Sequence, residues 1–312
     1  MRYVCCQPAS VYYTWQVEVL TNNFMKQGVN PAQMDIVCGY TPQTGVPPNW
    51  QKMADHYSNV GFYFYPDTEM DKSYPPSIYF HLLAKHLAAV PQRQNEVLFL
   101  HDSDIVFTKP PKFEHLEAGN TWYLSDTNSY LNYDYIMTKG AHIYHQMCTI
   151  FNINPLIPKL MNSNSGGAQY IVKNTTPAFW EKVERDCHTL YAHFCATEHL
   201  HIKKSEFDYP IQKWTAGMWA LLWNAWLHGH ETKVTKDMDF GWVTNDISDV
   251  EKYTILHNAG VVGGEEKHKR LFYKAAFGIT LPYNVELDID ETKASWYYWQ
   301  QVQESAKNTI LL

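Results

Sequence analysis

Short apolar segments alternate with helical patterns along the first third of the chain, and this alternation limits the fold more than any other feature. The segments are bounded by turn and helix signals, such as Pro75-Pro76 before one helical pattern and Pro91 after it. Strand–helix–strand alternation is typical of a Rossmann-like α/β fold, with a mostly parallel central sheet flanked by helices. The expected order is strand 2–7, helix 11–26, strand 34–40, strand 61–66, helix 77–90 and strand 96–107.

The second half of the chain has a weaker pattern. Residues 127–160 are rich in Tyr, Asn and Pro and predict irregular structure with one short helix around 141–150. There is no internal repeat and no low-complexity linker, so we expect one continuous domain over 1–312. The remaining candidates are strands at 121–126, 166–174 and 254–264 and helices at 176–193 and 210–228.

Charge and cysteine content exclude some classes of protein. The 25 Lys and Arg residues are outnumbered by 32 Asp and Glu residues, a net charge of -7, which argues against tight binding to a nucleic-acid backbone. Six cysteines without a C-x-x-C pair make a zinc ribbon improbable and are read as reduced thiols.

Two features argue against a membrane-bound or exported chain. No apolar run approaches the roughly 20 residues that span a bilayer. The first ten residues lack the apolar core of a signal peptide and are interpreted as the start of a buried strand. We therefore expect a soluble, cytoplasmic protein.

An acidic pair follows the strongest apolar segment. In VLFLHDSDIVF, Asp102, Ser103 and Asp104 come directly after Val97–His101, four of whose five residues are large and apolar. Two carboxylates at the end of a buried strand need a cation beside them. Mg²⁺ and Mn²⁺ bind through one or two carboxylates and the phosphates of a ligand. The sequence thus predicts a metal–diphosphate site here, whereas the D-x-D pairs at 237–239 and 288–290 are interpreted as solvated turns.

A histidine late in the chain offers a further ligand. His257 ends an apolar segment, ILHNAG, and is followed by Gly260 and a glycine-rich, lysine-containing stretch. Neutral imidazole binds Mn²⁺ and other transition ions. Glycine allows the backbone close to a phosphate, and a lysine such as Lys267 or Lys269 neutralises one. A solvated face is the alternative for these lysines.

The succession VLFLHDSDIVF, GGAQYIVKN and ILHNAG resembles the GT-A class of nucleotide-sugar glycosyltransferases. In that class an acidic D-x-D binds Mn²⁺ and the nucleotide diphosphate, and several families add a histidine in an H-x-x-G context, matched here by His257 to Gly260. The overall sequence pattern is similar to that of hydroxyproline and serine O-glycosyltransferases of plants and of glycosyltransferases of large viruses. Without a membrane anchor, a bacterial or viral origin is expected. The K-P-W ending of the glycogenin-like family is missing.

The resemblance implies that different parts of the chain bind the donor and the acceptor. Residues 1–110 would form the nucleotide-sugar half, 111–275 the acceptor and metal-completing half, and 276–312 a C-terminal extension. Metal ligands would be Asp102, Asp104 and His257, with Mn²⁺ or Mg²⁺ as cofactor. Other donor contacts implied by the resemblance are Gln7, Pro8, Asp71, Tyr74, Ser77, Lys85, Asp102, Ser103, Gly166, Gly167, Gln169, Gly260 and Lys267.

Catalysis by such an enzyme needs a base for the acceptor hydroxyl or a means of stabilising an oxocarbenium-like transition state. Asp208, Glu206 and Asp239 are candidate bases in the acceptor half; N-capping is the ordinary alternative for Asp208. Inverting and retaining chemistry both stay open. The six histidines between 188 and 230 lack H-E-x-x-H spacing and are interpreted as ordinary side chains. Trp219, Trp223 and Trp226 share a helical face and predict core packing.

The leading hypothesis is therefore a metal-dependent glycosyltransferase that uses a nucleotide sugar, with a UDP-sugar favoured. Its acceptor would be a glycan, a protein hydroxyl or a small molecule. A variant acts on a modified DNA base, which the net charge disfavours and the basic stretch 267–270 keeps open. A non-catalytic carbohydrate- or nucleotide-binding module is the alternative from another class. A phosphodiesterase or nucleotidyltransferase would need more converging carboxylates than the sequence offers.

Overall fold

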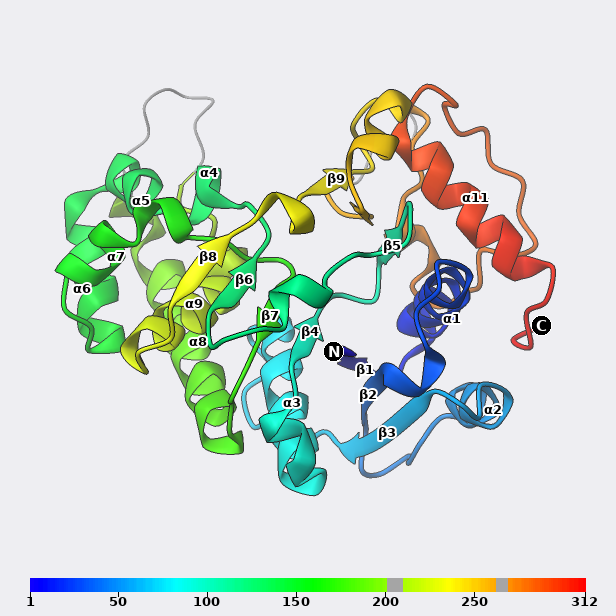
Figure 1. Cartoon of the computed structure of the whole chain (residues 1–312), viewed down its shortest axis with the longest axis horizontal. Helices are drawn as coiled ribbons and strands as arrows, with labels where there is room; N and C mark the ends of the chain where they lie inside the picture. Colours follow the sequence, from blue (N-terminus) through cyan, green and yellow to red (C-terminus); the bar gives the residue numbers. More distant parts are fainter. Residues whose placement is uncertain (201–209, 262–268) are drawn as a thin grey trace. The chain divides into compact units, whose positions relative to one another are not determined.

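The computed structural model of the chain describes residues 1–200, 210–261 and 269–312 (Figure 1). It contains two compact units. The first unit comprises 1–67, 101–115 and 237–312, and the second comprises 68–100 and 116–236. Both units combine helices with sheet strands, which confirms the expected α/β class. Within the described residues, no helix is both long enough and apolar enough to cross a membrane.

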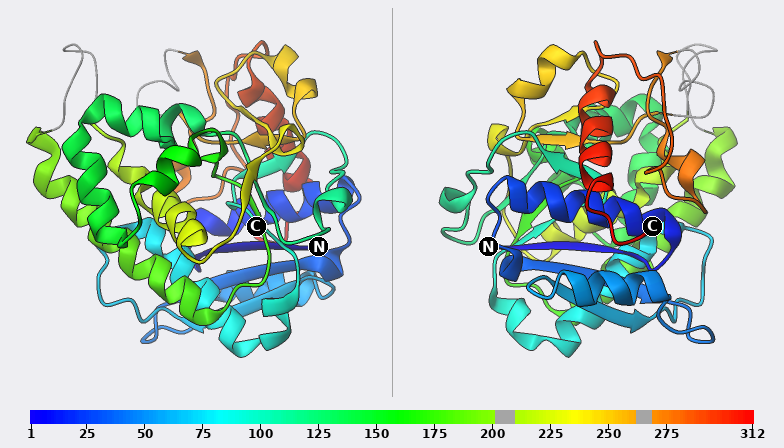
Figure 2. Two further views of the ribbon diagram at one scale, coloured as in Figure 1. Left: turned by 60° about the vertical axis from the view of Figure 1, so that its left-hand side comes forward. Right: turned by 90° about the vertical axis from the view of Figure 1, so that its right-hand side faces the viewer.

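Three parallel strands form the larger sheet of the first unit. They are β1 (Arg2–Pro8), β2 (Met34–Tyr40) and β3 (Gly61–Pro66), in the order β3-β2-β1. Helix α1 (Val11–Lys26) lies along this sheet (Figure 2), and α2 (Pro48–His56) precedes β3. Strands β2 and β3 and helix α1 all begin and end where the sequence pattern predicted. Their apolar residues recur at the strand or helix period.

A small three-stranded sheet completes the first unit. Its strands are β5 (Ile105–Phe107), β10 (Ile255–His257) and β9 (Phe240–Trp242), with β10 central, antiparallel to β5 and parallel to β9. Helix α11 (Ala294–Ala306) packs against α1 and against the 3-10 helix Ile247–Lys252. The prediction of one strand over 96–107 is wrong: β4 (Leu98–Leu100) belongs to the second unit, and the polar residues 101–104 turn the chain between β4 and β5.

The sheet of the second unit has the order β4-β7-β6-β8. Strand β7 (Tyr170–Val172) runs antiparallel to β4 and to β6 (Trp122–Leu124), and β6 is parallel to β8 (Thr232–Val234). Leu98, Phe99 and Leu100 of β4 are all buried, so this strand reads as a continuous apolar run.

Helices make up most of the second unit. Helix α3 (Ile78–Ala89) packs against α8 (Pro177–Thr197), which packs against α9 (Ala216–Leu227). Trp219, Trp223 and Trp226 are buried, as their spacing predicted. Residues 127–160 are more helical than predicted, since four short helices form there: α4 (Asn128–Leu131), α5 (Tyr133–Lys139), α6 (Ala141–Phe151) and α7 (Leu156–Leu160).

A buried carboxylate joins α1 to the last residues of the first unit. Glu18 is fully buried and accepts hydrogen bonds from the hydroxyl of Tyr283 at 2.5 Å, the hydroxyl of Thr309 at 2.7 Å and the backbone N–H of Ile310 at 3.3 Å. Burial raises the pKa of Glu18, and these hydrogen bonds offset only part of that rise. Glu18 therefore favours its protonated form in the folded chain more than in the unfolded one.

The linkage between this carboxyl and folding predicts a pH dependence. Because the folded pKa lies above the unfolded value, the contribution of Glu18 to stability is full at low pH and falls as the pH rises through the folded pKa. Each unit of pKa difference corresponds to about 1.4 kcal/mol. Denaturant unfolding of the wild-type and Glu18→Gln proteins across pH 4 to 8 should show their stability difference moving against the wild type as the pH rises. A difference that stays constant over this range would contradict the prediction.

Candidate metal and donor site

The acidic pair lies in the turn between β4 and β5. The backbone N–H of His101 donates to the carbonyl of Val4 in β1 at 3.1 Å, and the ring Nδ1 of His101 donates to the carbonyl of Asp102 at 2.8 Å. Burial lowers the pKa of His101 to about 4, so its ring is neutral at pH 7. These bonds fix the backbone of the turn. The Asp102 side chain is 51% exposed, whereas that of Asp104 is 5% exposed.

Strand pairing brings His257 to this turn. In the antiparallel pair of β5 and β10, His257 lies opposite Ile105, the residue after Asp104. The backbone N–H of Asn258 then donates to the carbonyl of Asp104 at 2.9 Å. As a result, Nε2 of His257 lies 3.3 Å from Oδ1 of Asp104 and 3.4 Å from Oδ2 of Asp102. The three residues that the sequence proposed as ligands thus come together.

The imidazole of His257 is held by its neighbours. The ring of Trp242 in β9 stacks on it, with centroids 5.6 Å apart and an interplanar angle of 16°. Phe240, two residues earlier in the same strand, contacts the ring at a centroid distance of 5.8 Å. These aromatic contacts restrict the direction in which Nε2 points, which is what a preorganised ligand requires.

A lysine neutralises the buried carboxylate. The ammonium of Lys274 forms an ion pair with Oδ2 of Asp104. Burial by itself would raise the pKa of Asp104, but Lys274 and then His257 outweigh it and hold that pKa well below its usual range. Burial likewise lowers the pKa of His257, while Asp104 and Asp102 raise it by more. Asp104 is therefore ionised at neutral pH, as a metal ligand must be.

The geometry and the donor atoms fit one divalent ion. The ligand atoms of Asp102, Asp104 and His257 lie within 4.8 Å of one another. Neighbouring ligands of an octahedral ion with bonds of about 2.1 Å are about 3 Å apart, close to the distances around His257. Two carboxylate oxygens and one imidazole nitrogen form a set suited to Mn²⁺ and similar ions. The half-exposed Asp102 leaves room for oxygens of a ligand.

Gln7 places a buried acceptor at the carboxyl end of β1. Its Nε2 donates to the carbonyl of Val37 and to Sγ of Cys38, both at 3.2 Å. Gln7 is only 2% exposed, and its Oε1 has no hydrogen-bond partner among the described residues. An unsatisfied buried oxygen is costly, so a donor from outside the described residues would stabilise it. Pro8 follows at the strand end and is partly exposed.

Other proposed donor contacts gather in the second unit around the start of α3. Tyr74 is buried, and its hydroxyl donates to the carbonyl of Trp214 at 2.6 Å and accepts from the N–H of Gly217 at 2.9 Å. The Ser77 hydroxyl is buried 2.6 Å from Oε1 of Glu69, while the exposed Asp71 faces His188. Lys85 lies on α3, partly exposed.

The loop 166–169 is a tight connection into β7. The N–H of Gly167 donates to the carbonyl of Ser125 at 3.0 Å, and the hydroxyl of Ser125 donates to Oε1 of Gln169 at 2.7 Å. Ala168 has a φ of 68°, in the left-handed region. A Cβ on Gly166 would lie 2.5 Å from Cβ of Leu124 and from the carbonyl of Ser125. Close backbone packing against β6 therefore accounts for glycine at 166.

Three further proposed residues, Gly260, Ser103 and Asp239, belong to the first unit. Gly260 has a φ of 89°, which favours glycine, and Ser103 is buried in the acidic turn. Asp239 is partly buried just before β9. The candidate bases Glu206 and Asp208 and the candidate phosphate contact Lys267 lie outside the described residues.

No protein-family model and no curated protein sequence matches the chain. Among solved structures, it is similar to the bifunctional glycosyltransferase WbbM, with 9% identity, a TM-score of 0.49 and coverage of 99% of this chain and 50% of that one. It is also similar to the glycosyltransferase GlyE of Streptococcus pneumoniae TIGR4, with 8% identity, a TM-score of 0.46 and coverage of 97% of this chain and 60% of that one. A third similar structure is a glycosyltransferase involved in the glycosylation of the major capsid of PBCV-1, with 12% identity, a TM-score of 0.41 and coverage of 86% of this chain and 98% of that one.

This chain thus spans about half of WbbM and 60% of GlyE. At identities of 12% or less and TM-scores below 0.5, these likenesses establish neither a family nor an activity. What the chain does has to be argued from its own site.

Sequence reasoning missed Lys274 and Trp242. Lys274 lies in the short 3-10 helix Lys274–Phe277, beyond the lysines at 267 and 269 that were proposed. Trp242 offers no motif, although it ends the apolar FGW segment that became β9. The need for a cation beside the buried Asp104 was foreseeable, but which lysine supplies it depends on the tertiary contact.

Lys274 competes with a metal for Asp104 when no nucleotide is bound. Lys274→Met removes the ammonium from Oδ2 of Asp104, so Mn²⁺ alone should bind about tenfold more tightly, equal to about 1.4 kcal/mol. Isothermal titration calorimetry of the nucleotide-free protein measures this. Lys293→Met, which breaks the ion pair of Lys293 with Asp246, is the matched control. Equal or weaker Mn²⁺ binding by the Lys274 variant would contradict the expectation.

Gly166→Ala tests the packing of the loop before β7. The added methyl group would overlap Leu124 and Ser125, so we expect the free energy of unfolding to fall by about 2 kcal/mol. Gly278→Ala is the control, because its Cβ would find its nearest neighbour at 3.7 Å and should leave stability almost unchanged. Equilibrium unfolding in urea compares the two variants; equal stability would show that the loop adjusts freely.

Proposed function

We propose that the protein is a metal-dependent glycosyltransferase that moves a sugar from a nucleotide-sugar donor, a UDP-sugar, to a hydroxyl of a glycan, protein or small-molecule acceptor. The observation that carries this proposal is the convergence of Asp102, Asp104 and His257 at the end of β4, beside Lys274. Two carboxylates, one imidazole and one ammonium form a site for a metal-bound diphosphate rather than for a neutral ligand.

The four side chains divide the binding work by their burial. Asp104 and His257 are almost fully buried and would hold a Mn²⁺ or Mg²⁺ ion from the protein side. Asp102, half exposed, would share the ion with the ligand. Such an ion, when bound, neutralises the negative charge that develops on the departing diphosphate. Hexosyl and pentosyl donors carry the same diphosphate, so these residues do not distinguish between them. The donor screen described below identifies the sugar.

Lys274 and Gln7 support a nucleotide at this site. Lys274 would exchange its ion-pair partner, from Asp104 to a phosphate oxygen of the nucleotide. The metal ion bound by Asp104 would then balance the charge of that carboxylate in place of Lys274. The unpaired Oε1 of Gln7 can accept a hydrogen bond from the ring N–H of a uracil base. Both residues belong to the first unit, and ligands of parallel sheets bind at the carboxyl ends of strands.

The sugar and acceptor contacts remain part of the proposal. The family resemblance alone assigns Gly166, Gly167 and Gln169 to the donor sugar and Tyr74, Ser77 and Lys85 to the donor; the polar groups of Gln169, Tyr74 and Ser77 are hydrogen-bonded within the protein. Asp208, Glu206 and Asp239 are the bases proposed for the acceptor hydroxyl, a role that needs a carboxylate within hydrogen-bond reach of the attacking oxygen.

Donor hydrolysis is the test that needs no knowledge of the acceptor. The purified protein is incubated with a panel of nucleotide sugars, with Mn²⁺ or with a chelator, and nucleotide release is measured. Release from one donor should require the metal and should fall at least about 100-fold in Asp104→Asn, because the buried oxygen ligand is lost. Asp288→Asn is the matched control: it lies in another D-x-D pair, is 80% exposed and should keep full activity.

Two results would contradict the proposal. One is nucleotide release that neither the chelator nor Asp104→Asn reduces. The other is an absence of release together with nucleotide binding that is independent of metal, which would instead favour a non-catalytic binding module. Metal-dependent nucleotide binding without release would identify a donor site whose enzyme waits for its acceptor, and the acceptor search would start from that donor.

A further inference from the structure

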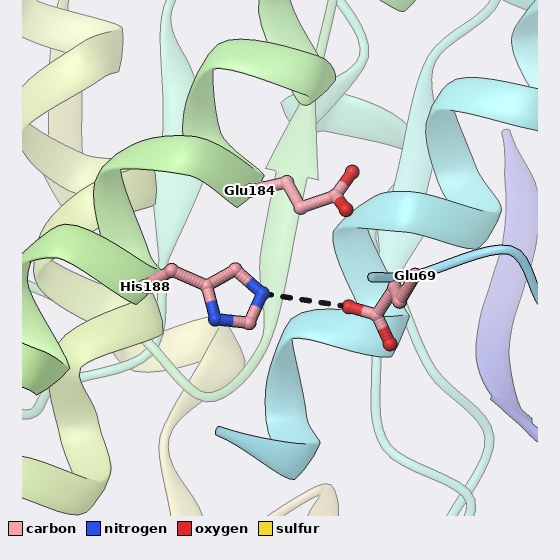
Figure 3. Close-up of side chains that lie close together, drawn as sticks. All are labelled: Glu69, Glu184 and His188. Atoms are coloured by element: carbon pink, nitrogen blue, oxygen red, sulfur yellow. Dashed lines mark ion pairs between the residues drawn. The ribbon is translucent and has the colours of Figure 1, made fainter. Parts of the chain in front are cut away.

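A second cluster of metal-binding side chains lies within the second unit. Glu69 comes from the segment that follows β3, and Glu184 and His188 are four residues apart on α8. One ligand atom of each lies within 4.8 Å of the others. Figure 3 shows the imidazole and the two carboxylates meeting from these two segments, with Nε2 of His188 3.6 Å from Oε1 of Glu69.

The distance between His188 and Glu69 is too long for a hydrogen bond but suits two ligands of one ion. Ligands of a tetrahedral ion with bonds of about 2.0–2.1 Å are about 3.3 Å apart. On the helix, residues four apart point to the same side, so Glu184 and His188 are presented together by the backbone of α8. The arrangement is thus built by a regular helix and one facing segment.

Two of the three side chains are hydrogen-bonded by a neighbour, and the third faces a carboxylate. The Ser77 hydroxyl lies 2.6 Å from Oε1 of Glu69, and Nδ1 of His81 lies 3.0 Å from Oε1 of Glu184. Nδ1 of His188 faces Oδ2 of Asp71 at 3.4 Å. The second ring nitrogen of a metal-bound histidine is commonly directed at a carboxylate, as Nδ1 of His188 is here, although it makes no hydrogen bond to Asp71.

Burial and charge favour a cation here. The Glu69 side chain is 3% exposed, that of Glu184 20% and that of His188 15%, and Asp71 adds a third carboxylate. The Nζ of Lys72, on an exposed side chain, is 3.8 Å from Oε2 of Glu69. Nδ1 of His188 is buried and makes no hydrogen bond in the described part of the chain. Carboxylates gathered at such low exposure are stabilised by a bound positive ion.

We propose that Glu69, Glu184 and His188 bind one divalent transition-metal ion of the Zn²⁺ type, with a water as fourth ligand. An imidazole ligand favours such an ion over Ca²⁺, which takes oxygen ligands. The ion joins the segment after β3 to α8. This site shares no residue with the Asp102, Asp104 and His257 cluster, so the proposal does not depend on the proposed transferase activity.

The test uses the full chain in an Asp102→Asn/Asp104→Asn background, which removes carboxylate ligands from the other cluster. After dialysis against low-micromolar Zn²⁺, elemental analysis should find about one zinc ion per chain, and Zn²⁺ should raise the melting temperature by several degrees. Adding Glu184→Gln and His188→Gln should abolish both effects. Co²⁺ in place of Zn²⁺ should give visible absorption bands of an imidazole- and carboxylate-bound ion, lost in the same variant.

Matched controls separate this site from other histidines and carboxylates. Glu181→Gln on the exposed side of α8 and His145→Gln on α6 remove the same groups from exposed positions and should leave zinc content and the thermal shift unchanged. Circular dichroism without metal checks that each variant is folded. The proposal is overturned if the background protein binds no zinc, or if it keeps its zinc and its thermal shift when Glu184 and His188 are both replaced.

Discussion

The antiparallel pairing of β5 with β10 is the contact on which the candidate site depends. It sets His257 opposite Ile105 and lets the N–H of Asn258 bond to the carbonyl of Asp104, so a histidine far along the chain reaches the acidic turn. A slip of this register by one residue would turn His257 to the other face of the strand and away from Asp104. Strand β9 adds Trp242, whose ring fixes the imidazole.

Buried negative charge is the second organising constraint, and the chain meets it with different partners at different places. Asp104 is balanced by Lys274 and His257. Glu18 instead accepts hydrogen bonds from the hydroxyls of Tyr283 and Thr309, and burial raises its pKa. A charge that is balanced stays ionised and can bind a cation, whereas one that only accepts hydrogen bonds in a buried place is pushed toward its neutral form. Asp104, whose charge is balanced, can therefore act as a metal ligand, whereas Glu18 acts as a buried hydrogen-bond acceptor within the fold.

Some of this organisation was predictable from local sequence and some was not. The bounds of α1, β2 and β3 follow from apolar periodicity, and Asp102 and Asp104 were identified because they directly follow an apolar strand. The division of 96–107 into β4 and β5 was missed, because both pieces are equally apolar and only their partners distinguish them. Within 127–160 only α6 was predicted; α4, α5 and α7 were missed because their polar and aromatic residues carry little periodicity. His188 was interpreted as an ordinary histidine, since its neighbour Glu69 lies on a different segment.

The sequence by itself determined the α/β class, the first three strands and helix α1, and the place of the acidic pair, because all of these depend on residues close together in the chain; it missed α2 between β2 and β3. Only the tertiary structure decided which lysine pairs with Asp104, which ring holds His257 and which carboxylate faces His188. Those contacts join segments far apart in the sequence. They depend on strand pairing and helix packing, which periodicity and spacing along one chain do not encode.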